Sequence, residues 1–182
     1  MGKKVLILMG SPRKNGNSDI LSDEFARGAK DAGHELTKVI VKEKQINECL
    51  GCCACLKNGG KCVQKDDMQN IYEQMNEADV IVLTSPVYFS TWSATMKRLL
   101  DRTIAVAHVL KHKTFYLISA AMATDESYMT TMLDNYHRYA NTYRSGGSKE
   151  GGYVFGYGTD KPGDVVGTPA MSQAYEMGKD IL

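Results

Sequence analysis

Three features that often assign a sequence to a class are scarce or missing in this chain of 182 residues. It contains only 4 prolines and 43% hydrophobic residues, which excludes a collagen-like or disordered chain. It has no excess of one charge, because 22 Lys and Arg against 21 Asp and Glu leave a formal net charge of +1, and we therefore expect no nucleic-acid partner. No apolar run approaches the roughly 18 residues of a membrane span, so we expect no membrane association.

The sequence also begins without the pattern of a secretory signal. Lys3 and Lys4 precede an apolar run over residues 5–9, which is too short for the core of a signal peptide and has no small-residue cleavage site after it. We therefore expect a cytoplasmic protein.

Short apolar runs alternate with helical stripes along most of the chain. The runs predict strands over residues 4–9, 34–41, 79–84, 113–121 and 153–157. The stripes predict helices over about residues 21–33, 68–75, 96–107, 125–143 and 171–182. This alternation indicates a single α/β domain, residues 1–182, with a doubly wound sheet of five parallel strands and helices on both faces. Residues 43–65 form a long irregular insertion after the second strand, and residues 85–91 are expected to form a loop.

The loop after the first strand, GSPRKNGNS at residues 10–18, has the composition of an anion site. Its glycines allow close approach of the backbone, Arg13 is a cation, and the helix that follows directs its free N–H groups at the loop. It is neither a Walker A loop nor a GxGxxG fingerprint, so a single terminal phosphate is the expected ligand. The alternative is a polar turn that only caps the helix. The expected binding residues are Ser11, Arg13, Asn15, Asn17 and Ser18.

Two further segments give the chain a family resemblance. SPVYF at residues 85–89 and KRLLDR at residues 97–102, together with the first loop, resemble the flavodoxin-like NAD(P)H-dependent FMN reductases. The resemblance implies one flavodoxin-like FMN-binding domain, with the FMN phosphate in the first loop and NAD(P)H as electron donor. It also implies contacts to the flavin ring, which it assigns to Pro86, Val87, Tyr88 and Phe89, and to Ala120 and Ala121, where family members often have glycine. No catalytic side chain is expected, because hydride passes directly from nicotinamide to flavin N5.

All five cysteines of the chain lie between residues 49 and 62. Cys49, Cys52, Cys55 and Cys62 have a spacing that can surround a [4Fe–4S] cluster from one loop, whereas the fifth, Cys53, has no assigned role. A compact run of this form resembles the iron–sulfur flavoproteins, which belong to the same superfamily. Zinc, a regulatory dithiol and plain reduced thiols are the alternatives that the spacing leaves open.

These patterns favour an FMN-dependent NAD(P)H oxidoreductase that reduces a small acceptor of the flavin, quinone or nitroaromatic type. The alternative is an iron–sulfur flavoprotein electron carrier that passes electrons between FMN and a [4Fe–4S] cluster, and a third is a binding module without turnover. We expect residues 146–152 or a partner subunit to form the open face of the flavin. A homodimer is expected from the resemblance and from the aromatic residues Tyr88, Phe89, Trp92, Tyr136 and Tyr143.

Overall fold

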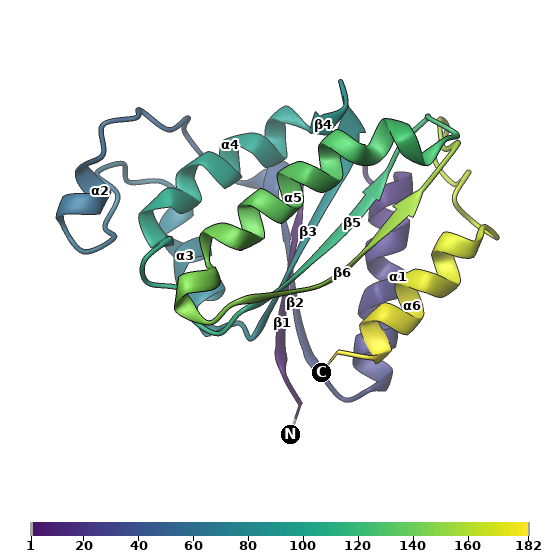
Figure 1. Ribbon diagram of the computed structural model, residues 1–182, viewed down its shortest axis with the longest axis horizontal. Helices are drawn as coiled ribbons and strands as arrows, with labels where there is room; N and C mark the ends of the chain where they lie inside the picture. Colours follow the sequence, from purple (N-terminus) through teal and green to yellow (C-terminus); the bar gives the residue numbers. More distant parts are fainter. Residues whose placement is uncertain (1, 182) are drawn as a thin grey trace.

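A parallel sheet with the strand order β2-β1-β3-β5-β6 forms the centre of the computed structural model, which describes residues 2–181 (Figure 1). Its strands are β1 (Lys4–Met9), β2 (Glu35–Ile40), β3 (Val80–Tyr88), β5 (Thr114–Ala120) and β6 (Lys149–Gly156). The chain starts in the middle of the sheet, because Val5 pairs with Leu36 on one side and with Val80 on the other. A doubly wound sheet of this order is flavodoxin-like, and the predicted fold class is confirmed.

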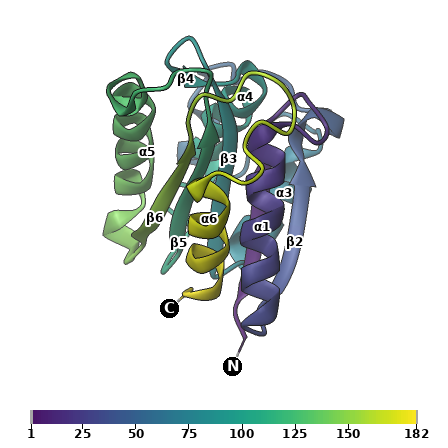
Figure 2. The same ribbon diagram turned by 90° about the vertical axis from the view of Figure 1, so that its right-hand side faces the viewer.

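Helices cover both faces of the sheet (Figure 2). They are α1 (Asn17–Asp31) and α6 (Pro169–Lys179) on one face, and α3 (Met68–Glu77), α4 (Ala94–Arg102) and α5 (Thr130–Thr142) on the other. Successive side chains of a strand point to opposite faces, so Val5 and Ile7 enter the core under α1 and α6, while Leu6 and Leu8 enter the core under the other three helices. This explains why the inner strands are apolar on both faces.

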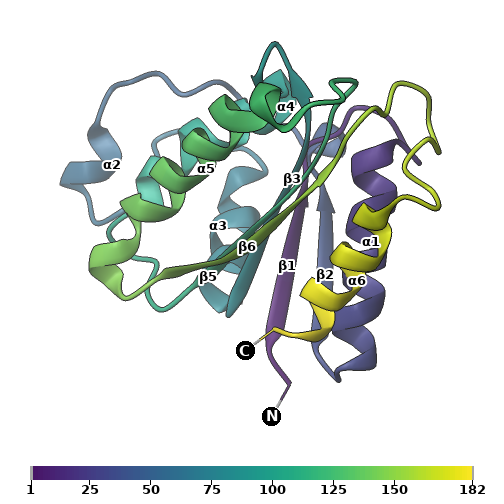
Figure 3. The same cartoon turned by 45° about the vertical axis from the view of Figure 1, so that its right-hand side comes forward.

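Helices α1 and α6 approach each other closely through two glycines (Figure 3). A Cβ atom on Gly28 would lie 2.0 Å from the Tyr175 carbonyl oxygen, and one on Gly178 would lie 2.1 Å from the Phe25 carbonyl oxygen. Both contacts are shorter than real Cβ atoms make, so only glycine permits this packing. The close approach fixes the position of α1, whose N-terminus is part of the site described below.

Several element boundaries differ from those expected. Residues 85–91, expected as a loop, mostly belong to β3 and to a short sixth strand, β4 (Thr91–Trp92), which pairs antiparallel with β3. The fifth predicted strand begins at residue 149 rather than 153, and α1 begins at residue 17 rather than 21. A short 3₁₀ helix (Thr103–Val106) replaces the C-terminal end of the helix predicted over residues 96–107. Another (Glu126–Met129) replaces the N-terminal end of the helix predicted over residues 125–143. The last helix ends at residue 179, and the end predicted for it, Leu182, lies outside the described residues.

The cysteine-rich insertion is present where it was predicted, after β2. A 3₁₀ helix (Val41–Glu43) leads into it, it contains one helical turn, α2 (Ala54–Lys57), and it extends beyond α3 and α4 at one side of the molecule (Figure 1). A further 3₁₀ helix (Arg144–Gly146) joins α5 to β6. Among the described residues, no helix is long and apolar enough to cross a membrane.

Candidate functional site

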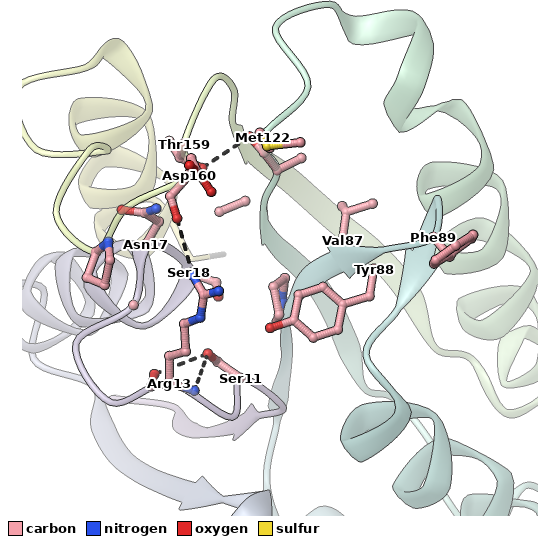
Figure 4. A pocket seen from close by; sticks show the side chains of 15 residues that line it. Ser11, Arg13, Asn17, Ser18, Val87, Tyr88, Phe89, Met122, Thr159 and Asp160 are labelled. Carbon is pink, nitrogen blue, oxygen red and sulfur yellow. Dashed lines mark hydrogen bonds between the residues drawn. The ribbon is translucent and has the colours of Figure 1, made fainter.

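A cavity of about 410 Å³ lies at the carboxyl ends of β1, β3 and β5, at the edge where ligands of doubly wound sheets bind (Figure 4). The first loop, the end of β3, the end of β5 and the loop after β6 contribute its walls. Its lining residues are Ser11, Arg13, Gly16, Asn17, Ser18, Pro86, Val87, Tyr88, Phe89, Ala120, Ala121, Met122, Thr159, Asp160 and Pro162. Ten of the eleven predicted cofactor-binding residues therefore lie around one cavity, and the eleventh, Asn15, is exposed and does not line it.

One end of this cavity has the features of an anion site. Helix α1 begins after Gly16 without a capping side chain, and the backbone N–H groups of Asn17 and Ser18 have no acceptor within residues 2–181. The Arg13 guanidinium points across this end and donates to the Asp160 carbonyl oxygen at 3.2 Å. The Ser11 hydroxyl accepts from the Arg13 N–H at 3.1 Å, which bends the loop around the helix terminus. Free N–H groups, a helix dipole and a cation together favour a phosphate.

The side chain of Asn17, expected to bind the phosphate, forms hydrogen bonds to the loop after β6. Its Nδ2 donates to the Lys161 carbonyl oxygen at 2.9 Å, and its Oδ1 accepts from the N–H groups of Gly163 (3.0 Å) and Val165 (3.3 Å). Three hydrogen bonds thus join the amide group to the loop after β6. Asn17 can offer its backbone N–H to an anion, whereas its side chain holds the opposite wall of the cavity.

The other end of the cavity is apolar. Pro86, Val87 and Tyr88 end β3, and the Tyr88 ring projects towards the first loop (Figure 4). Phe89 and Ser90 form the two-residue connection to β4, with φ angles of 47° and 66°. The turn directs the Phe89 ring away from the other lining side chains, and this ring is fully exposed. An apolar wall facing a phosphate site suits a ligand with a flat ring and an anionic tail.

Buried hydroxyl groups fix the three loops relative to one another. Ser93, the N-cap of α4, donates from its hydroxyl to the Gly10 carbonyl oxygen at 2.7 Å, and its N–H donates to Ser85 Oγ at 3.0 Å. The Ser119 hydroxyl donates to the Ser85 carbonyl oxygen at 2.6 Å. Gly10 is required for this arrangement, because a Cβ there would lie 2.6 Å from Met96 Cβ. The ends of β1, β3 and β5 are therefore held as one rigid rim.

A second cavity, of about 380 Å³, lies under the cysteine-rich insertion. All five cysteines line it, together with Arg102 and Asp101 at the end of α4 and the apolar side chains of Leu50, Leu56, Val63, Ile104 and Ala105. Cys55 is the most buried thiol, and burial raises its pKa, with a smaller contribution from the neighbouring Cys62. Within the described part of the chain, no three His, Cys, Asp or Glu side chains are grouped closely enough for a single metal ion.

Residues 3–134 match the family described as NADPH-dependent FMN reductase. This chain belongs to that family. An iron–sulfur flavoprotein of Archaeoglobus fulgidus is 32% identical to this chain, over 98% of this chain and 78% of the relative. An iron–sulfur flavoprotein of Methanocaldococcus jannaschii is 31% identical over 98% of this chain and 95% of its own.

Solved structures show the same fold as this FMN reductase family member. An NAD(P)H:quinone oxidoreductase from Methanothermobacter marburgensis superposes with a TM-score of 0.76, at 18% identity, over 98% of this chain and 96% of its own. An azoreductase from Bacillus anthracis gives a TM-score of 0.75, at 15% identity, over 98% and 100% of the two chains. The resemblance inferred from the three sequence motifs is confirmed.

The sequence motifs missed one wall of the cavity in this reductase-family chain. Thr159, Asp160 and Pro162 line it, and the Thr159 N–H donates to the Ala121 carbonyl oxygen at 2.9 Å, which joins the loops after β5 and β6. The polar string TDKPG after the fifth strand was the available signal, because the carboxyl ends of parallel strands meet at one edge. Residues 146–152, expected near the open face of the flavin, instead precede or begin β6 at the opposite edge of the sheet.

Proposed function

We propose that this chain is an NAD(P)H-dependent oxidoreductase that binds FMN in the 410 Å³ cavity and passes electrons to a small acceptor of the flavin, quinone or nitroaromatic type. One observation carries the proposal. A cation and an uncapped helix N-terminus occupy one end of the cavity, and an apolar wall occupies the other. FMN has a matching polarity, and when bound it supplies the capacity to accept two electrons and to release them singly or together.

Different residues of the chain would bind the phosphate and the ring of FMN. Arg13, Ser11, Ser18 and the α1 N-terminus would hold the phosphate, because each presents a cation or a hydrogen-bond donor at that end. Residues 86–89 and 120–122 would border the ring and exclude water from one of its faces. Tyr88 is 42% exposed, which leaves room for a second flat molecule beside it. We assign no proton-transfer role to a side chain, because the reductive step needs positioning alone.

A [4Fe–4S] cluster in the second cavity is the companion proposal, and it makes an electron carrier the second candidate function. Cys49, Cys52, Cys55 and Cys62 all line that cavity, and the buried Arg102 offsets part of the negative charge that four thiolates would bring. A zinc ion needs its sulfur ligands within about 2.3 Å of one point, whereas a four-iron cluster binds each thiolate at a separate corner. The dispersed thiols of this loop suit the cluster better.

The test is made on protein purified without oxygen. The expected result is one FMN per chain, about four iron and four sulfide, and loss of the flavin absorption when NADPH or NADH is added. Recovery of that absorption on adding a flavin, quinone or nitroaromatic would identify a reductase. Recovery only with a protein electron acceptor would favour the carrier, and bound flavin that neither donor reduces would contradict both.

We further propose that the whole chain, residues 1–182, acts as one FMN-binding domain, and that it works as a homodimer in the cytoplasm. Support for one domain comes from the two cores, which share the same sheet. Support for a dimer comes from exposed apolar side chains beside the FMN cavity, of which Phe89 and Met122 are the most exposed.

A further inference from the structure

Arg102 is the most unusual charged residue outside the FMN cavity. It is the last residue of α4, and only 1% of its surface is exposed. Its guanidinium makes a two-pronged ion pair with Asp66, at 2.7 and 3.1 Å, and donates to the Asn47 carbonyl oxygen at 2.8 Å. Its Nη2 also lies 3.4 Å from Cys62 Sγ, which it can reach as a hydrogen-bond donor. Its Nε is buried and has no acceptor within the described residues.

The charge of this guanidinium is permanent. Burial is the largest single effect on Arg102 and favours its neutral form, but the hydrogen bonds with Asp66 and the attraction of neighbouring acidic groups together outweigh it and hold the pKa of Arg102 above its ordinary value. Burial likewise opposes ionisation of Asp66, but the hydrogen bonds from Arg102 and from the N–H groups of Asn47 and Met68, with the Arg102 charge, together outweigh it, so the pKa of Asp66 lies below its ordinary value. The pair is therefore a fixed dipole inside the protein.

The dipole is oriented with respect to the cysteine cavity. Arg102 lines that cavity and contacts Cys62, whereas Asp66 does not line it. The positive end thus faces the thiols and the negative end lies behind it. Asp101 also lines the cavity, but it is half-exposed and paired with Lys97, so the buried guanidinium beside Cys62 dominates the electrostatic potential at that thiol.

We propose that Arg102 is a positioning residue that raises the reduction potential of the cluster bound by Cys62 and its three partner cysteines. The inference rests on the proposed [4Fe–4S] cluster. One electron from the flavin reduces the cluster, and the charge of the core with its four thiolates changes from −2 to −3. A fixed cation stabilises the more negative state, and a hydrogen bond to a ligand sulfur acts in the same direction. Asp66 holds the guanidinium in place and weakens its effect.

A purely structural role would give different results. Arg102 also ties residue 47 of the insertion to α4, so its loss alone could loosen the cysteine loop and lower cluster content. A loosened loop has no reason to shift the potential one way when both partners are neutralised and the other way when Asp66 alone is neutralised. An electrostatic role requires these opposite signs, because the double change removes the nearer cation, whereas the loss of Asp66 alone leaves that cation uncompensated.

The test is a potentiometric titration of the holoprotein, followed by the electron paramagnetic resonance signal of the reduced cluster. The double variant Arg102→Gln/Asp66→Asn is the main one, because it leaves no buried unpaired charge and keeps the net charge unchanged. We expect the equilibrium constant for reduction of its cluster to fall about tenfold, which is about 59 mV for one electron. Asp66→Asn alone should shift the constant the other way by a few fold.

Arg138→Gln is the matched control, because it removes an exposed cation whose partner, Asp134, lines neither cavity, and it should leave the potential unchanged. A double variant that keeps its iron and sulfide but shifts the constant by less than twofold would overturn the role of Arg102 and leave the proposed function intact. Shifts of the same sign in the double variant and in Asp66→Asn would also overturn it. Wild-type protein without iron or sulfide would overturn the cluster proposal, and this inference with it.

Discussion

At the scale of single residues, the FMN cavity relies on very few charged or donating groups. Arg13 and Ser18 both line its anion-binding end. Hydrogen bonds to a charged group contribute about 1.5–3 kcal/mol each, so replacing both residues with alanine should weaken FMN binding about 100-fold or more. Fluorescence titration of the apoprotein with FMN measures this directly. Lys14→Ala is the control, since Lys14 is exposed in the same loop and does not line the cavity. Unchanged affinity in the double variant would remove the phosphate assignment.

The cysteines allow a second prediction at this scale. Serine at Cys49, Cys52, Cys55 or Cys62 should lower iron and sulfide content and the broad cluster absorption, because each removes a thiolate ligand. Serine at Cys53 should leave both unchanged. Cys53 is exposed, and its Sγ lies 3.5 Å from the Gly51 carbonyl oxygen. All five variants should bind FMN normally, because the two cavities have no lining residue in common. Equal iron loss at all five positions would contradict these ligand assignments.

At the scale of elements, the loop after β6 depends on one side chain of α1. Asn17→Ala removes three hydrogen bonds and leaves two N–H groups without an acceptor, so we expect the free energy of unfolding to fall by about 1–3 kcal/mol. Amide hydrogen exchange at residues 161–166 should accelerate. Asn17→Asp keeps the acceptor oxygen and should retain most of this protection while it weakens FMN binding by charge repulsion. Equal protection in wild type and Asn17→Ala would contradict the loop-holding role.

The turn between β3 and β4 carries backbone strain. Phe89 and Ser90 both have positive φ, a conformation that two-residue hairpin turns assign to Asn-Gly. The double change Phe89→Asn/Ser90→Gly should raise the free energy of unfolding by about 1 kcal/mol, measured by urea denaturation. Swapping the order, to Phe89→Gly/Ser90→Asn, is a control for composition. A wild-type chain that is more stable than the Asn-Gly variant would show that the exposed Phe89 ring has a stabilising partner in the native assembly.

The elements show where sequence reasoning succeeds and where it stops. Apolar runs located all five parallel strands, most clearly the inner strands β1, β3 and β5, because a strand buried on both faces has few alternatives. The hairpin at residues 85–92 was missed, since neither Phe89 nor Ser90 is one of the Asn, Asp or Gly residues that mark a two-residue hairpin turn. The role of Asn17 was also missed, because its partners lie 144 to 148 residues away in sequence. Composition identifies a donor, whereas only the packed chain identifies its acceptor.

At the scale of the whole molecule, most of the aromatic side chains from which a homodimer was expected are buried. Using Trp92, Tyr136 and Tyr143 as support for a dimer was wrong, because all three are buried in the core under α3, α4 and α5. Tyr136, for example, donates to the Phe115 carbonyl oxygen at 2.7 Å. Tyr88 and Phe89 are exposed, as are Met122 and Tyr128, and these four side chains are the basis for an interface.

We expect a homodimer in sedimentation velocity at micromolar concentration. Met122→Glu should weaken it at least tenfold, because a charge would enter an apolar contact. Val63→Glu is the control, since Val63 is similarly exposed but lies beside the cysteine cavity. A wild-type monomer at these concentrations would contradict the expectation.

Helix α4 connects the two cavities. Its N-cap, Ser93, is bonded to the loops that line the FMN cavity, and its last residue, Arg102, lines the cysteine cavity. Nine residues of α-helix rise about 13.5 Å. With FMN and a cluster bound in these cavities, the length of one helix would set much of the separation between the two centres of a single molecule. One added helical turn, about 5.4 Å, would lengthen this internal route, and electron transfer along it would slow because tunnelling rates fall steeply with distance.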